Sequence, residues 1–345
     1  MIPEERAFAA AAAADRAAGS AAPTGPGRRL SPYRVVGVLV VAALVVAAVA
    51  AYRSRHDDAR VALPVSAFMP YVDVTVTPAF GFEDPSRTAA TSLALGFVVS
   101  DPDDGCAPSW GAAYSLDAAA ASLDLDRRIA RTRQRGGDVV ASFGGAANDE
   151  LSVRCDDPAK LAGAYAAVVD RYRLTAIDLD VEGVEASSPE ASLRRAQAIR
   201  AVQDDQRKAG QDLAVWLTLP IAPSGLTQQG VVVLRAMLAA KVDLAGVNAM
   251  TMDFGAAKTA GQSMFQASRS ALLELNRQLI DAYDGAGMKL SADEAWQRIG
   301  ATPMIGQNDV PAERFGLDDA GELMAFAQDR HLRRLSMWSL NRDQP

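Results

Sequence analysis

From residue 68 to the end of the chain, short runs rich in β-branched and aromatic residues alternate with longer stretches of helical pattern. This alternation is typical of a parallel sheet whose strands are joined by helices. It predicts strands at 68–76, 93–99, 138–142, 175–181, 214–219, 246–250, 301–305 and 335–339. It also predicts helices at 126–135, 158–172, 189–209, 227–241, 264–284 and 318–330.

Eight strands that alternate with helices favour an α/β fold of the (β/α)8 type, the TIM barrel, which needs about 250 residues. The chain has 345 residues, so an N-terminal extension fits beside one large domain. A doubly wound sheet shows the same alternation, and the pattern alone does not separate the two folds. In both folds the functional residues are expected at the carboxyl ends of the strands.

The residues that precede this region differ from it in composition. Residues 1–34 are rich in Ala, Gly, Pro and Ser, which predicts a disordered tail. Residues 35–52 are 18 uncharged positions flanked by arginines, which predicts a single N-terminal transmembrane helix that anchors the protein. The alternative is a signal peptide cleaved after Ala48-Val49-Ala50. Residues 53–67 are then a linker and 68–345 the barrel domain, held outside the cell membrane or secreted if the segment is cleaved.

The strand predicted at 175–181 carries a regular series of acids. Because side chains alternate along a strand, Asp178, Asp180 and Glu182 share one face and apolar residues occupy the other. In a barrel the acidic face points inward, where charged groups are costly to desolvate and their pKa values rise. Glu182 is expected at the rim, where a raised pKa suits a general acid. The alternatives are an exposed edge strand and a Mg²⁺ or Ca²⁺ site.

Charge and cysteine content exclude several other functions. The net charge of −7 and the pI near 5.0 argue against binding to nucleic acid. Two cysteines and two distant histidines do not suffice for a tetrahedral metal site, so we expect no metal and no cofactor. Cys106 and Cys155 are candidates for one disulfide in an exported domain, and two buried free thiols are the alternative.

With these residues in view, the region 66–345 resembles glycoside hydrolase family 18, the chitinases and their bacterial chitinase-D-like relatives. The family motif D-x-x-D-x-D-x-E stands here from Thr175 to Glu182, with Thr in place of the first Asp. The motif S-x-G-G stands at 142–145, and M-x-Y-D stands at 250–253 with Met252 in place of Tyr. A tryptophan on the last strand of the family matches Trp338.

The resemblance implies an endo-β-N-acetylglucosaminidase type of enzyme that cleaves β-1,4-linked N-acetylglucosamine in chitin or chitooligosaccharides. It implies a retaining, substrate-assisted mechanism in which the substrate's own acetamido oxygen attacks the anomeric carbon. Glu182 would be the acid/base, Asp180 would hold the acetamido N–H, and Asp178 would share a proton with Asp180. No cofactor is implied, and we expect a monomer.

The substrate-binding residues expected from the motifs and from the ends of the strands are Tyr71, Trp110, Ser142, Met250, Met252, Asp253, Gln307 and Trp338. The family's tyrosine donates a hydroxyl to the acetamido group, which Met252 cannot do, and Tyr71 is the nearest replacement that the sequence suggests. Losing such a donor lowers the rate on the order of 10²–10³-fold. A catalytically weak or inactive chitooligosaccharide-binding lectin on the same barrel is therefore the alternative function.

Overall fold

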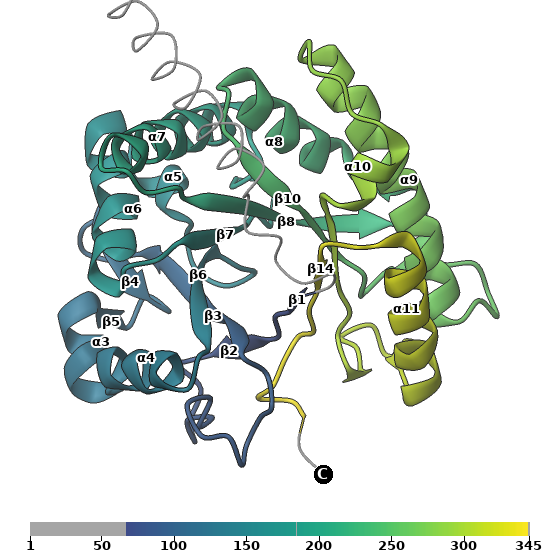
Figure 1. Cartoon of the computed structure of the whole chain (residues 1–345), viewed down its shortest axis with the longest axis horizontal. Helices are drawn as coiled ribbons and strands as arrows, with labels where there is room; N and C mark the ends of the chain where they lie inside the picture. Colours follow the sequence, from purple (N-terminus) through teal and green to yellow (C-terminus); the bar gives the residue numbers. More distant parts are fainter. Residues whose placement is uncertain (1–66, 184, 344–345) are drawn as a thin grey trace, which may run out of the picture. The chain divides into compact units, whose positions relative to one another are not determined.

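The computed structural model describes residues 67–183 and 185–343 of the chain. Their parallel strands lie at the centre of the domain, and helices surround them (Figure 1). In chain order the strands that build this central sheet are β1 (Ala67–Phe68), β2 (Tyr71–Asp73), β3 (Ser92–Ser100), β6 (Asp138–Gly144), β7 (Ala176–Asp180), β8 (Ala214–Ala222), β10 (Leu244–Met250), β11 (Ile299–Thr302) and β14 (Arg334–Leu335).

The sheet closes because β1 and β2 act as one interrupted strand. β1 pairs in parallel with β14, and β2 pairs in parallel with β3. Across the interruption, the amide of Met69 donates to the carbonyl of Leu335 at 2.8 Å and the amide of Tyr71 donates to that of Met337 at 3.0 Å. A doubly wound sheet would leave two open edges. The prediction of a (β/α)8 barrel is therefore confirmed for the described residues.

The helices begin where the sequence provides caps. Asp157 accepts hydrogen bonds from the amides of Ala159 and Lys160 and is followed by a proline, and Ser188 caps the next long helix in the same way. The helices are α3 (Leu116–Ser122), α4 (Leu125–Gln134), α5 (Leu151–Arg154), α6 (Pro158–Tyr172), α7 (Pro189–Lys208), α8 (Gln228–Ala239), α9 (Met264–Gly285), α10 (Ala292–Trp296) and α11 (Leu317–Arg330).

Short additional elements decorate the loops of the barrel. β4 (Pro108–Trp110) and β5 (Tyr114–Ser115) extend the sheet beyond β3 in antiparallel fashion, and β9 (Gly225–Leu226) folds back on β8. β12 (Gly306–Gln307) and β13 (Arg314–Phe315) form a hairpin between β11 and α11. A 3₁₀ helix, η2 (Gly255–Ala257), follows β10. These elements lie in the loops that connect the barrel strands and are not part of the central barrel itself.

Apolar side chains are buried in two separate clusters. The large cluster lies between the barrel and its helices and contains Ile177, Leu179 and Val181 from β7 and the residue after it. The small cluster comprises Met69, Tyr71, Ala94 and Val140, with Phe97, Ala176 and Trp338 packed against it. The period-two pattern of β7 therefore places its apolar face outward against the helices and its acids inside the barrel.

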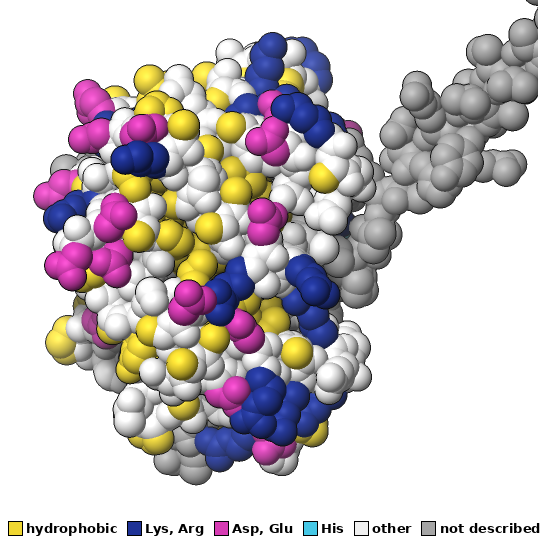
Figure 2. All heavy atoms as spheres, turned by 90° about the vertical axis from the view of Figure 1, so that its left-hand side faces the viewer, with side chains coloured by type: hydrophobic (Ala, Val, Ile, Leu, Met, Phe, Trp, Pro, Cys, Tyr) yellow, Lys and Arg dark blue, Asp and Glu magenta, His cyan; other side chains and the backbone are white. Residues whose placement is uncertain are grey.

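The surface of the described domain carries charges of both signs. On the face that holds α3, α4 and α6, acidic and basic side chains are interspersed, and Lys and Arg gather on its lower part at the height of α4 (Figure 2). Among residues 67–183 and 185–343, no helix is both long and apolar enough to span a bilayer. The predicted tail, the segment 35–52 and all but the last residue of the linker lie outside the described residues.

Candidate active site

The acidic series follows β7 to the carboxyl end of the barrel. Asp178 is fully buried and Asp180 is 4% exposed, whereas Glu182, two residues past the pairing, is partly exposed. β7 lies between β6 and β8, so the alternative of an exposed edge strand is wrong. The three carboxyl groups thus rise from the barrel interior to its rim, where barrel enzymes have their active sites.

Asp178 is the centre of a buried hydrogen-bond network. Its Oδ2 accepts from the Tyr71 hydroxyl at 2.8 Å and from the Ser142 hydroxyl at 2.7 Å. Its Oδ1 accepts from the Thr218 hydroxyl at 2.7 Å and from Nη1 of Arg334 at 2.8 Å. Four strands besides its own, namely β2, β6, β8 and β14, therefore each supply one donor to a single carboxyl group.

Asp180 and Glu182 share a side-chain hydrogen bond, and the surroundings favour protonation of both. Burial, followed by the charges of Glu182 and Asp178, raises the pKa of Asp180 well above its ordinary value. Burial also raises the pKa of Glu182 to about 7, with a further contribution from the charge of Asp253 and an opposing one from the hydrogen bond of Asp180. A proton is thus available on this pair near neutral pH, as general acid catalysis requires.

The S-x-G-G motif lets β6 approach the acidic strand closely. Gly144 has a φ of +102°, and a Cβ there would lie 2.1 Å from the carbonyl oxygen of Asp180. The amide of Gly145 donates to that same carbonyl at 3.0 Å, and a Cβ on Gly145 would lie 2.9 Å from the ring of Phe97. Larger residues at either position would push β6 away from Asp180 or displace the Phe97 ring.

Three aromatic rings meet beside the acids. Trp338, partly exposed, stacks on Phe97 with ring centroids 5.4 Å apart. The buried ring of Tyr71 packs edge-on against Trp338 at 6.0 Å. An exposed face of a rigid aromatic ring is a suitable surface for the apolar face of a sugar, and the predicted role of Trp338 stays a prediction.

Asp253 is held by the loop that follows β12. Its carboxylate accepts the amide of Val310 at 2.8 Å, and its own amide donates to the side chain of Asn308 at 3.2 Å. The next two amides, those of Phe254 and Gly255, donate to the carboxylate of Glu313, which is 2% exposed. The loop after β10 is thereby fixed at the position from which Asp253 acts electrostatically on Glu182.

The loop after Glu182 is anchored by a buried ion pair. Arg195 of α7 donates to the carbonyl of Ala186 at 2.7 Å and to Glu150 at 3.0 Å. Burial alone would raise the pKa of Glu150, but the charge and hydrogen bonds of Arg195 outweigh it and hold that pKa below its ordinary value. Tyr165 completes the network by donating its hydroxyl to Glu150 at 2.5 Å.

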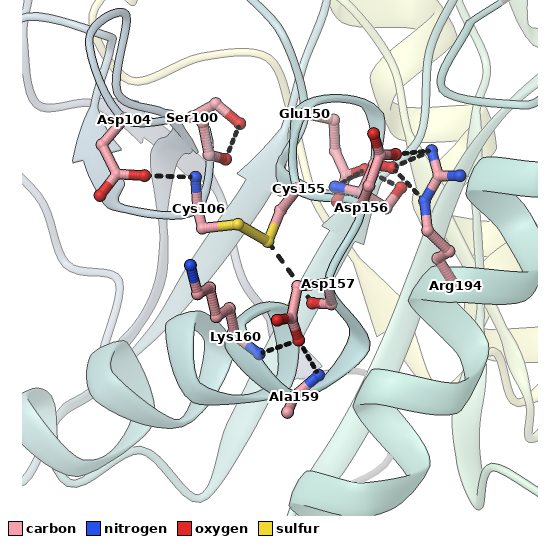
Figure 3. The surroundings of a disulfide bond; sticks show 12 residues. Ser100, Asp104, Cys106, Glu150, Cys155, Asp156, Asp157, Ala159, Lys160 and Arg194 are labelled. Carbon is pink, nitrogen blue, oxygen red and sulfur yellow. Dashed lines mark hydrogen bonds and ion pairs between the residues drawn. A yellow bond between two sulfur atoms is a disulfide. The ribbon is translucent and has the colours of Figure 1, made fainter.

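Cys106 and Cys155 form a disulfide, the first of the two possibilities that the sequence left open. The bridge joins the loop between β3 and β4 to the C-cap residue of α5, two positions before the residue that caps α6 (Figure 3). Close by, Arg194 donates to the carbonyl of Ser152 at 2.7 Å and pairs with Asp156 at 3.4 Å. These contacts fasten the segment that carries Glu150.

Three of the predicted substrate-binding residues are not available to a sugar. Trp110 is fully buried in the outer cluster, and its indole N–H donates to the Tyr172 hydroxyl at 3.0 Å. Tyr71 is 1% exposed and Ser142 is fully buried, and both direct their hydroxyls at Asp178. The prediction of substrate contact is wrong for these residues, and Tyr71 is not a replacement for the hydroxyl missing at Met252.

The remaining predicted contacts lie on the active face. Met250 and Asp253 are partly exposed, and Met252 is 8% exposed, at the carboxyl end of β10 and just beyond it. Gln307 is exposed, but its side-chain amide donates to the carbonyl of Glu313 at 2.8 Å and so supports its own loop. Substrate contact by these residues stays a prediction.

Sequence reasoning missed several residues of this site. Phe97 was overlooked because an aromatic residue in a strand usually belongs to the core. Thr218 and Asn248 lie in apolar strands, and their positions across the barrel from Asp178 cannot be derived from periodicity. Arg334 offered a signal, because it is a charged residue at the start of a strand whose period-two face points into the barrel.

Two cavities outlined by the described residues lie away from Glu182. One of about 540 Å³ is lined by Thr175, Arg173 and Gln211 among others, at the amino-terminal end of β7. A smaller one of about 250 Å³ lies near Ser100 and Asp149. The acids are therefore a better guide to the site than cavity size. No group of three or more His, Cys, Asp or Glu in the described part of the chain is arranged to hold a metal ion.

The site is thus a series of carboxyl groups at the carboxyl end of the strands of a closed barrel, which is where barrel enzymes have their active sites. The chain is 37% identical over 300 residues to the probable bifunctional chitinase/lysozyme of Escherichia coli, a match that covers 85% of this chain and 33% of that protein. It is 36% identical over 301 residues to endochitinase 11 of Metarhizium anisopliae, covering 85% and 55%. The chain therefore spans about a third and about half of the lengths of these relatives.

Solved structures of chitinases also resemble this chain. The catalytic domain of a hyperthermophilic chitinase from Pyrococcus furiosus is 28% identical, with a TM-score of 0.70 over 82% of this chain and 86% of that one. A family 18 chitinase from Pseudoalteromonas aurantia, at 18% identity and a TM-score of 0.54 over 81% and 96%, shares the fold. The chain is therefore similar in sequence to proteins named as chitinases and shares the fold of a family 18 chitinase. No family model matches it.

Proposed function

We propose that this barrel hydrolyses β-1,4-linked N-acetylglucosamine in chitin or chitooligosaccharides. The observation that carries the proposal is the pairing of Glu182 at the rim, with its pKa raised to about 7, with the buried carboxyl of Asp180. The names of the two relatives, a chitinase/lysozyme and an endochitinase, support this substrate class. An endo mode of cleavage follows the second of these names.

In the proposed mechanism the substrate supplies its own nucleophile. The 2-acetamido oxygen attacks the anomeric carbon while Glu182 donates its proton to the leaving glycosidic oxygen. The resulting oxazolinium-like intermediate is then opened by water, from which Glu182, now a carboxylate, accepts a proton. The configuration at the anomeric carbon is retained by these two inversions.

Asp180 is suited to bind the acetamido N–H. Its Oδ1 is buried and has no hydrogen-bond partner among the described residues. An unsatisfied buried acceptor is costly, and an incoming amide N–H removes that cost. As positive charge develops on the amide during ring closure, a carboxylate at this position stabilises the transition state more than the ground state. Trp338 would support the sugar ring from below.

The test uses a fluorogenic chitobioside and a chitotrioside with the full-length chain. Wild type is expected to release the aglycone, and Glu182→Gln is expected to lose activity on the order of 10²–10⁴-fold because it cannot transfer a proton. Glu185→Gln, an exposed residue of the same loop, is the matched control and should retain activity. If wild type bound chitooligosaccharide but released no aglycone, the proposed hydrolase activity would be rejected in favour of a lectin.

We also propose that the chain is held at the cell membrane by residues 35–52, with the barrel outside. The proposal is supported by the uncharged run in the sequence and by the disulfide, which is typical of proteins in oxidising compartments. We propose that the barrel acts as a monomer.

A further inference from the structure

A buried arginine lies directly beneath the acids of the site. Arg334, 1% exposed, enters the barrel interior from β14 and donates from Nη1 to Asp178 at 2.8 Å. Its Nε donates to the Ser336 hydroxyl at 2.7 Å, and its guanidinium lies 5.3 Å from the ring centroid of Tyr71 and 5.5 Å from that of Trp216. Its Nη2 has no partner among the described residues.

Stability alone does not account for this residue. Burying a guanidinium costs free energy, and the unpartnered Nη2 adds to that cost. An apolar side chain of similar volume between Tyr71 and Trp216 would fill the space without either cost. The positive charge of Arg334 must therefore have a role of its own in the barrel interior.

The hydrogen bonds around Asp178 form one connected network. The hydroxyl groups of Tyr71, Ser142 and Thr218 and Nη1 of Arg334 all lie within hydrogen-bond distance of Asp178. The hydroxyls of Tyr71 and Thr218 also lie 2.9 Å from each other, where either one can donate. The amide of Asn248 donates to the oxygens of Tyr71 and Thr218, at 3.3 and 3.0 Å, so these oxygens are already used as acceptors. The guanidinium of Arg334 cannot give up its charge, and Asp178 is the carboxyl group with which it forms an ion pair among the described residues, with both side chains buried. An ionised Asp178 balances this buried positive charge.

We infer that Arg334 is a positioning residue that keeps Asp178 ionised and so confines the exchangeable proton of the acidic strand to Asp180 and Glu182. This differs from the expectation drawn from the family resemblance, in which Asp178 and Asp180 share a proton. The consequence for catalysis rests on the proposed function, whereas the charge state of Asp178 does not. Arg334 touches neither Glu182 nor a sugar and acts through Asp178.

The other ionisable groups around Asp178 are consistent with this assignment. Tyr71 of β2 is neutral, since burial raises its pKa well above the ordinary value. Asp180 faces Asp178 along β7, and burial, followed by the charges of its neighbours, raises its pKa well above the ordinary value. Glu182 and Asp253 lie farther up, at the rim, where the charge of Asp253 contributes to the raised pKa of Glu182.

The first experiment observes Asp178 without relying on activity. The full-length chain is labelled with ¹³C at the carboxyl carbons of aspartate, and the resonance of Asp178 is assigned by its loss in Asp178→Asn. In wild type we expect the chemical shift of an ionised carboxylate at neutral pH. A protonated Asp178 at neutral pH in wild type would overturn the inference.

The second experiment removes the charge. In Arg334→Met we expect the midpoint of the Asp178 titration to rise by about one pH unit or more, because a contacting cation is lost from a buried site. The pH values at which kcat/KM rises and falls should also move to higher pH in this variant. Arg334→Lys, which keeps the charge, should restore the wild-type midpoint even if kcat is reduced.

The matched control is Arg128→Met. Arg128 is 6% exposed and paired with Glu83 at 2.9 Å, on α4 and away from the acidic strand. The Arg128→Met substitution should lower the free energy of unfolding but leave the pH profile of kcat/KM unchanged. A folded Arg334→Met protein with an unchanged Asp178 midpoint would contradict the inference. If wild type released no sugar while Asp178 titrated as expected, the proposed function would fail and the inference about Arg334 would stand.

Discussion

At the scale of single residues, the burial that raises the pKa of Glu182 also destabilises the fold. In the folded chain its pKa is raised from the ordinary 4.5 to about 7, chiefly by burial. Between these two values the folded state binds a proton that the unfolded state has released. The contribution of Glu182 to the free energy of unfolding is therefore fully present below pH 4.5 and is lost as the pH rises through 7.

Replacing Glu182 with Gln should accordingly stabilise the protein at alkaline pH while abolishing turnover. At pH 8 we expect a gain in the free energy of unfolding on the order of 3 kcal/mol, because the buried charge is removed. At pH 4 the variant and wild type should be equally stable. Urea unfolding at the two pH values measures the difference. Glu185→Gln should show no such pH dependence, and an equal gain at pH 4 and pH 8 would refute the electrostatic origin.

Sequence patterns predicted the face on which a residue lies better than its depth. The period of two placed Asp178, Asp180 and Glu182 together correctly, because alternation along a strand is a local property. It could not distinguish residues at the rim from residues inside the barrel, which depends on the stagger between strands. The sequence therefore predicts Tyr71 and Ser142 as substrate contacts, whereas in the structure both donate hydrogen bonds to Asp178.

At the scale of elements, the long helices were predictable and the short ones were not. The predicted helix at 158–172 coincides with α6, because Asp157-Pro158 marks its start and a 15-residue apolar periodicity marks its length. Elements such as β4, β5 and α5 have two to four residues, too few for any period to show. They are determined by packing against the barrel, which a single segment of sequence does not contain.

The disulfide should contribute measurably to stability. It closes a loop with a sequence separation of 49, for which the loss of entropy in the unfolded chain predicts about 2–4 kcal/mol. We expect the double variant Cys106→Ser/Cys155→Ser to lose this much free energy of unfolding and therefore to unfold at a lower urea concentration than wild type. Wild type under reducing conditions serves as the comparison and should behave like the double variant. Unchanged stability in both would mean that the native contacts alone hold the β3–β4 loop.

The loop after β10 offers a test of how Asp253 is held. Removing the carboxylate in Glu313→Ala leaves the amides of Phe254 and Gly255 without their acceptor, at a cost of about 2 kcal/mol. Displacement of Asp253 should lower kcat by about tenfold or more. Glu322→Ala, an exposed glutamate on α11, is the control and should change neither quantity. Full activity in Glu313→Ala would show that the loop keeps its position without Glu313.

At the scale of the whole molecule, the barrel separates two environments that the proposed mechanism requires. The apolar cluster between sheet and helices supplies the hydrophobic burial, and the barrel interior holds the polar network of Asp178, Arg334 and Asn248. Closure of the sheet through β1 and β2 is what removes water from that interior. The same exclusion of water makes the proton affinities of Asp180 and Glu182 high.

The attachment of this barrel to a membrane is a separate prediction about the full-length chain. Residues 35–52 would form a helix about 27 Å long at 1.5 Å per residue, against a hydrocarbon core of about 30 Å. We expect the full-length chain to sediment with membranes and to resist extraction at alkaline pH, whereas a chain beginning at residue 53 should be soluble. Protease added outside intact cells should digest the barrel if the domain is exported. N-terminal sequencing separates the alternatives: a mature chain that begins at Ala51 would show a cleaved signal peptide and contradict the anchor.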